Sequence, residues 1–235
     1  MPIAHYDPLY LIIMGIAMVV SHVVGLTLRR KMAKYSQVPL RATGAEVAAQ
    51  MLADHGLQSV DITSVPGQLT DHYNPANKTV NLSEPVYAMH SVAAAAVAAH
   101  ECGHAVQDAT GYPMLRLRSN LVPLVQFGSN LAPWIIMIGV GLAAGGNNPT
   151  ILGIGILLFA LTTVFAIVTL PVEFDASRRA LAWLEKSGIA RGVSHDQAKD
   201  ALRWAALTYV VAALASIGQL LYYILLFLNA RGRRE

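Results

Sequence analysis

Four long apolar runs divide the chain. Residues 9–28, 121–144, 151–172 and 205–228 contain no Lys, Arg, Asp or Glu. About twenty residues of helix are needed to cross the hydrocarbon core of a bilayer. The hydrophobic pattern therefore predicts four membrane-spanning helices, separated by two polar stretches and one short turn.

The first polar stretch has the local patterns of a folded domain. Thr43 and Glu46 stand three residues apart, as in a capping box, ahead of a helix predicted over residues 44–55. Polar and apolar residues alternate over residues 58–65, which indicates a strand.

A hairpin is predicted next. Residues 69–73 and 79–82 flank the turn Asn74-Pro75-Ala76-Asn77. An edge strand of this kind can bind an extended peptide through main-chain hydrogen bonds, although a hairpin that only covers its neighbours is an equal alternative.

The pattern of the second polar stretch, residues 173–204, predicts two helical segments. One is predicted to end near Gly188, and another is predicted to open at Ser194, with Gln197 in the capping-box position.

Composition supports a membrane protein. Charged residues make up 13% of the chain and hydrophobic residues 54%, whereas a soluble domain has about a quarter charged residues. The single Cys excludes an internal disulfide framework. The basic residues lie beside the apolar runs and form no stripe interleaved with aromatic residues, so we expect a lipid bilayer as a partner and no nucleic acid.

The distribution of basic residues predicts an orientation. Residues 29–118 and 173–204 contain eight and six of the seventeen Lys and Arg, the turn at 145–150 contains none, and the C-terminal tail contains three. Because cytoplasmic segments are enriched in Lys and Arg, both polar stretches are expected in the cytoplasm. The basic cluster that follows the first run, rather than preceding it, indicates an uncleaved anchor.

An HExxH motif supplies the candidate chemistry. His100 and His104 are four residues apart in the alanine-rich segment 91–107 and would share one face of a helix, where two imidazoles can bind one ion. Glu101 would point to the side of that face, within reach of a water activated by the metal. The motif predicts one catalytic Zn²⁺ per chain, with Glu101 as the general base.

Local signals limit this helix. Ser83 and Pro85 are predicted to start it, and Gly111 with Pro113 to end it. Cys102 lies about 200° around the helix from His100 and is expected to be a buried thiol rather than a ligand.

A catalytic zinc needs a third protein ligand. Asp108 and His90 are too far along the helix axis from one member of the histidine pair. Five candidates remain: Asp71, His72, Glu173, Asp175 and His195. Glu173 is favoured because it begins the second polar stretch directly at a membrane end.

The motif stands in a longer recognisable context. The segment GQLTDHYNPANKTVNLSEPVYAMHSVAAAAVAAHECGHAVQ, preceded by YSQVPLRATGAEVAAQMLADHGL and followed by LRSNLVP, resembles the YugP-like family of neutral zinc metallopeptidases of bacterial membranes. The resemblance covers nearly the whole chain. It implies a membrane-embedded zinc endopeptidase of the bacterial cytoplasmic membrane, related in plan to the HtpX and CAAX prenyl protease group, with a glutamate ligand on a later helix.

The later motif of that group departs in one place. The group has E-x-x-A-D, and this chain has Glu173, Ala176 and then Ser177 in the place of the aspartate. A serine supplies no carboxylate to orient a histidine ligand.

The sequence therefore predicts a mainly α membrane protein of about four transmembrane helices, with a cytoplasmic α+β zincin-like catalytic portion. Its expected segments are an anchor (1–34), the catalytic portion (35–119), a transmembrane hairpin (120–172), a polar helical segment with the third ligand (173–204) and a C-terminal transmembrane helix with a basic tail (205–235). The expected substrate is a membrane-associated peptide or protein, cut at the cytoplasmic face in processing or quality control. Further candidates for substrate or transition-state contacts are His72, Tyr73, Arg178 and His195.

Two other interpretations stay open. In an intramembrane protease the alanine-rich helix would lie in the bilayer and a later span would supply an aspartate, but residues 121–172 contain no Asp or Glu. In a non-catalytic scaffold or metal-sensing protein the zinc would be structural, and such a site has no need of Glu101 beside its ligands.

Overall fold

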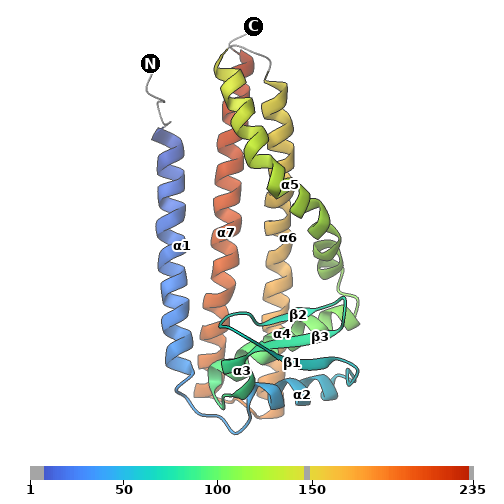
Figure 1. Cartoon of the computed structure of the whole chain (residues 1–235). Helices are drawn as coiled ribbons and strands as arrows, with labels where there is room; N and C mark the ends of the chain where they lie inside the picture. Colours follow the sequence, from blue (N-terminus) through green and yellow to red (C-terminus); the bar gives the residue numbers. More distant parts are fainter. Residues whose placement is uncertain (1–7, 146–148, 233–235) are drawn as a thin grey trace. The chain divides into compact units, whose positions relative to one another are not determined.

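The computed structural model describes residues 8–145 and 149–232 (Figure 1). Parts of the turn predicted at 145–150 and of the basic tail lie outside the described residues. The elements in chain order are α1 (Pro8–Tyr35), α2 (Gly44–Asp54), β1 (Asp61–Val65), β2 (His72–Asn74), β3 (Thr79–Ser83), α3 (Glu84–Ala88), α4 (Val92–Ala109), α5 (Pro113–Ala144), α6 (Thr150–Ser187) and α7 (Val193–Gly232).

These elements form two compact units. The apolar unit comprises Met1–Val23, Leu117–Thr169 and Tyr209–Glu235, and the site unit comprises Val24–Arg116 and Leu170–Thr208. Each of the long helices α1, α5, α6 and α7 contributes residues to both units.

Four helices, α1, α5, α6 and α7, are long and apolar enough to cross a membrane. In the apolar unit, α5 and α6 approach closely through glycines: a Cβ on Gly139 would lie 2.5 Å from the backbone of Leu152, and one on Gly155 would lie 2.9 Å from the backbone nitrogen of Ile136. Small residues at such contacts are typical of helix packing in membranes. The predicted mainly α membrane fold with four long apolar helices is confirmed.

A three-stranded sheet of order β1-β3-β2 belongs to the site unit (Figure 1). β2 and β3 pair antiparallel, with Tyr73 opposite Val80, so the predicted hairpin is confirmed. β1 pairs parallel with β3 and begins only at Asp61, three residues later than the alternating pattern predicted. β2 is an edge strand.

The helix carrying the HExxH motif begins later than predicted. Ser83 and Pro85 start a separate short helix, α3, and Met89 at its end adopts an extended backbone conformation. Because the chain is extended there, α4 needs its own N-terminal cap, and the Ser91 side chain accepts a hydrogen bond from the Ala94 N–H. The capping box of Thr43 and Glu46 on α2 is present as predicted.

The polar residues 173–204 belong to the two long helices. α6 continues without a break to Ser187 and α7 begins at Val193, so the predicted helix end near Gly188 is confirmed. The predicted capping box at Ser194 is wrong, since its hydroxyl donates to the Arg191 carbonyl and accepts from the Arg191 N–H within the preceding turn.

Candidate metal centre

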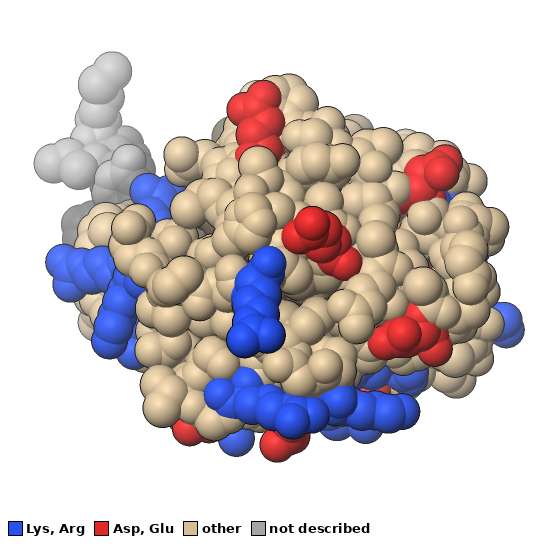
Figure 2. Space-filling model, turned by 90° about the horizontal axis from the view of Figure 1, so that it is seen from below, with Lys and Arg blue, Asp and Glu red and all other residues tan. Residues whose placement is uncertain are grey.

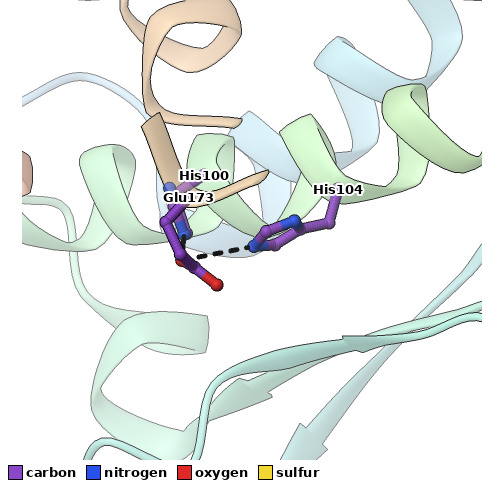
Figure 3. Close-up of side chains that lie close together, drawn as sticks. All are labelled: His100, His104 and Glu173. Carbon is purple, nitrogen blue, oxygen red and sulfur yellow. Dashed lines mark ion pairs between the residues drawn. The ribbon is translucent and has the colours of Figure 1, made fainter. Parts of the chain in front are cut away.

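Three side chains from two helices of the site unit converge. The Glu173 Oε2 atom lies 3.3 Å from His100 Nε2 and 3.7 Å from His104 Nε2 (Figure 3). Among the described residues, this is the group of His, Cys, Asp and Glu whose ligand atoms lie close enough together, within 4.8 Å, to hold one ion. Glu173 and His104 are buried, at 2% and 7% exposure.

A glycine lets α6 approach α4 at this point. A Cβ on Gly103 would lie 2.6 Å from the carbonyl oxygen of Ala176, a distance at which something must move. Gly103 lies directly before His104, and Ala176 lies one helical turn after Glu173. The missing side chain therefore allows the Glu173 carboxylate to reach both imidazoles.

Gln107 determines which nitrogen of His104 faces Glu173. The Gln107 amide nitrogen donates to the Val172 carbonyl at 2.8 Å and to Asp175 Oδ2 at 3.0 Å. Its Oε1 must then accept from His104 Nδ1, 3.0 Å away. Nδ1 accordingly carries the proton, and Nε2 keeps a lone pair directed at Glu173 and available to a metal.

Ser177 contacts the other histidine. Its hydroxyl lies 3.1 Å from His100 Nδ1, one helical turn beyond Glu173 on the same face of α6. The sequence predicts no orienting carboxylate at this position, because serine has none. The hydroxyl nevertheless occupies the position from which a partner can orient His100, and its i+4 spacing from Glu173 was the signal.

Asp175, one of the five ligand candidates, does not belong to the group of His100, His104 and Glu173. Its carboxylate accepts from Arg178, from Arg179 at 2.6 Å and from Gln107. Arg178 is thus paired with Asp175 on the same helix.

Glu101 is placed beside the group without belonging to it. Its side chain is 8% exposed, and its Oε2 accepts a hydrogen bond of 2.9 Å from the Tyr73 N–H of β2. The Tyr73 N–H therefore points away from β3 and toward α4. Glu101 is held at the free edge of the sheet.

The remaining predicted residues do not join the three ligand atoms. Asp71 accepts from the N–H and hydroxyl of Ser83. His72 is exposed and its Nδ1 donates to the Thr70 carbonyl, the Tyr73 hydroxyl donates to Asp108, and His195 lies in the first turn of α7.

Burial and charge set the protonation of nearby groups. Burial disfavours a charged His104, but the carboxylates of Glu173 and Glu101 outweigh burial and raise the pKa of this imidazole. Burial raises the pKa of the Cys102 thiol well above its usual range. Cys102 is fully buried toward the Ala48 carbonyl, so it is neither a ligand nor a reactive thiol.

The residues fit a zinc ion. Two imidazole nitrogens and one carboxylate oxygen are a donor set used by catalytic zinc. Ligand bonds of about 2.0–2.2 Å at tetrahedral angles place ligand atoms about 3.3–3.6 Å apart, close to the two separations of 3.3 and 3.7 Å from Glu173 Oε2.

The sequence has known relatives. Over residues 10–228 it matches the family described as "Putative neutral zinc metallopeptidase". It is 44% identical over 200 residues to the "Putative membrane protease YugP" of Bacillus subtilis (strain 168). The aligned residues make up 84% of this chain and 87% of that protein. No solved structure matches the chain. The matched range includes the HExxH helix and Glu173.

Proposed function

We propose that this chain, which belongs to the neutral zinc metallopeptidase family, is a membrane-embedded endopeptidase. It hydrolyses peptide bonds with one Zn²⁺ held by His100, His104 and Glu173. The observation that carries this proposal is the convergence of Glu173 on the histidine pair, with Glu101 beside them. A bound zinc ion acidifies a water molecule and polarises the carbonyl that is attacked.

Glu101 is the general base. Its carboxylate takes a proton from the attacking water, whose oxygen forms the new C–O bond. It then passes that proton to the nitrogen of the departing amine, and the C–N bond breaks. The hydrogen bond from the Tyr73 N–H restrains Glu101, which keeps one carboxylate oxygen oriented while the other is available to the water.

The free edge of β2 is the proposed platform for the peptide. The Tyr73 N–H points away from β3 and donates to Glu101. In an antiparallel pair the carbonyl of the same residue points the same way, so this carbonyl is the main-chain group that remains for a peptide. An extended peptide can therefore align with β2 by donating a main-chain hydrogen bond to this carbonyl next to Glu101. His72, exposed on the same strand, is a candidate contact to that peptide.

The site is proposed to face the cytoplasm. The support is the placement of fourteen of the seventeen Lys and Arg in the two polar stretches. On the face shown in Figure 2, Lys and Arg side chains stand with Asp and Glu among many uncharged residues. The proposed substrates are peptides or proteins associated with the membrane.

Metal removal tests this function. Dialysis of the purified protein against a chelator is expected to abolish hydrolysis of casein or a quenched fluorescent peptide library, and stoichiometric Zn²⁺ is expected to restore it. Magnesium, which prefers oxygen ligands, is the matched control and should restore nothing. Full hydrolysis by a protein shown to be free of metal would contradict the proposal.

Gln107 is proposed to orient His104 for zinc. Gln107→Leu removes both the acceptor for Nδ1–H and the link to Asp175, and we expect zinc affinity to fall about 10–100-fold, as for other partners of metal ligands. Competition with a fluorescent zinc chelator measures this. Gln37→Leu, an exposed position in the site unit, is the control, and equal affinity in both variants would exclude the role.

A further inference from the structure

A cavity of about 400 Å³ lies within the site unit, apart from the three ligand atoms. Its walls are the C-terminal part of α1, the loop before β2, helix α3 and the first turn of α4, represented by Met32, Leu69, Val86 and Ala93. Neither the metal centre nor Glu101 lines it.

The cavity and the metal centre lie along the same face of α4. Ala93, Val97, His100 and His104 follow one another at intervals of four, three and four residues, which places them on one stripe of the helix. Within residues 92–100, Val97 and His100 are the two that are partly exposed, and the other seven are buried. Val97, which is partly exposed, lies on this stripe between the cavity and the metal ligands.

Nine of the fifteen residues that line the cavity are apolar, and the hydroxyls of its three serines are already hydrogen-bonded. Asp71 lines it, but its carboxylate accepts the N–H and the hydroxyl of Ser83 at 2.7 and 3.0 Å. Arg29 is exposed, so its charge can stay in water at the rim. A group that enters this space is therefore selected by apolar contact.

The loop at the cavity wall has an unusual conformation. Leu69 has a φ of 58° and is 61% exposed. A bulky residue in the left-handed region costs free energy, and such residues gather at ligand sites. Leu69 also leaves an apolar side chain in solvent beside the cavity, where a bound group could cover it.

We propose that this cavity is a specificity pocket that receives a large apolar side chain of the peptide substrate. Ala93 and His100 are seven residues apart on α4, or about 10 Å along the axis. An extended peptide covers that distance in about three residues. The side chain in the pocket therefore belongs to a residue about three positions from the bond that is cut.

The position of the pocket on α1 indicates the substrate class. Its wall on α1 begins at Leu28, where the uncharged run of this helix ends and Arg29 follows. α1 is a candidate membrane span, so the pocket opens where that helix would leave the bilayer. A substrate anchored in the same membrane could present there an apolar side chain close to the end of its own anchor. This inference rests on the proposed peptidase function.

The test compares two alanines that receive the same substitution. Ala33 lines the pocket from α1 and is exposed, and Ala53 is exposed on α2 and does not line it. Peptides that carry Phe, Leu, Ala or Ser at each position around the cleaved bond are assayed with wild type, Ala33→Phe and Ala53→Phe. Wild type and Ala53→Phe are expected to prefer Phe or Leu over Ser at one position by about tenfold or more in kcat/KM.

In Ala33→Phe the new ring occupies the pocket, and this preference should fall below threefold. Leu69→Gly, in which glycine accepts the positive φ, should weaken the preference by removing part of the wall. The proposed pocket is contradicted if wild type does not prefer Phe or Leu over Ser at any position. It is also contradicted if Ala33→Phe keeps the preference of wild type.

Peptide binding tests the pocket independently of peptide hydrolysis. If wild type hydrolyses no peptide, the proposed function fails, and the pocket is then decided by fluorescence anisotropy of the Phe and Ser peptides. Tighter binding of the Phe peptide that is lost in Ala33→Phe and kept in Ala53→Phe supports the pocket, and equal binding by all three proteins overturns it. A co-purifying lipid that Ala33→Phe loses, with peptide selectivity unchanged, would identify an acyl chain as the occupant and also overturn it.

Discussion

Glu101→Gln is expected to reduce peptide hydrolysis by about 10²–10⁴-fold while zinc stays bound, because a general base is lost and no ligand is. Gln has the size of Glu, and its amide oxygen can still accept the Tyr73 N–H that Glu101 Oε2 accepts at 2.9 Å. The fold and the position of β2 should therefore persist. Turnover on a fluorescent peptide, zinc content and the thermal midpoint are measured on the same preparation.

Glu185→Gln is the matched control for this variant. Glu185 is exposed near the end of α6, so the same change there should leave hydrolysis at the wild-type rate. Equal turnover in Glu101→Gln and Glu185→Gln would rule out the mechanism. It would favour a scaffold or metal-sensing protein, for which zinc is structural and a neighbouring base is superfluous.

Glu173→Ala is expected to weaken zinc binding by well over tenfold. Losing a residue that only hydrogen-bonds a metal ligand already lowers metal affinity about 10–100-fold, and Glu173 is a proposed ligand itself. The variant also leaves two imidazoles without the carboxylate that lies 3.3 and 3.7 Å from them. Because metal binding stabilises the state that holds the ligands, the contact of α6 with α4 should loosen. Zinc competition and limited proteolysis between residues 173 and 204 report the two effects.

Two variants on the same helix bracket this result. Glu185→Ala makes the same substitution at an exposed site and should change neither zinc affinity nor proteolysis. Asp175→Asn should have an intermediate effect on zinc, because Asp175 acts only through Gln107 and His104. Full zinc occupancy in Glu173→Ala, or a larger loss in Asp175→Asn, would show that another carboxylate holds the ion.

The elements that the sequence predicted are those whose cause is local. The four apolar runs, the capping box of Thr43 and Glu46 and the β2–β3 hairpin each depend on residues a few positions apart. The error at the start of α4 has the same origin, since Ser83 and Pro85 are a genuine start signal that belongs to the short helix α3. The pattern could not show that the chain becomes extended at Met89 before α4 begins.

The close approach at the metal centre depends on residues far apart in the chain. The sequence left Glu173 among five candidates, favoured only by its place at the end of an apolar run. Gly103 and Ala176 are separated by more than seventy residues, and neither signals in the sequence that α4 and α6 touch there.

The sequence by itself determined that His100, Glu101 and His104 share one alanine-rich helix, because helical geometry acts over four residues. Only the tertiary structure decided that Glu173 reaches both imidazoles, that Ser177 contacts Nδ1 of His100, and that β2 lies against Glu101. The physical reason is that Gly103 has no side chain, which lets the backbones of α4 and α6 come together. The hydrogen bond from Ser177 to His100, and those that hold the Gln107 amide against α6, join groups that meet only through this packing.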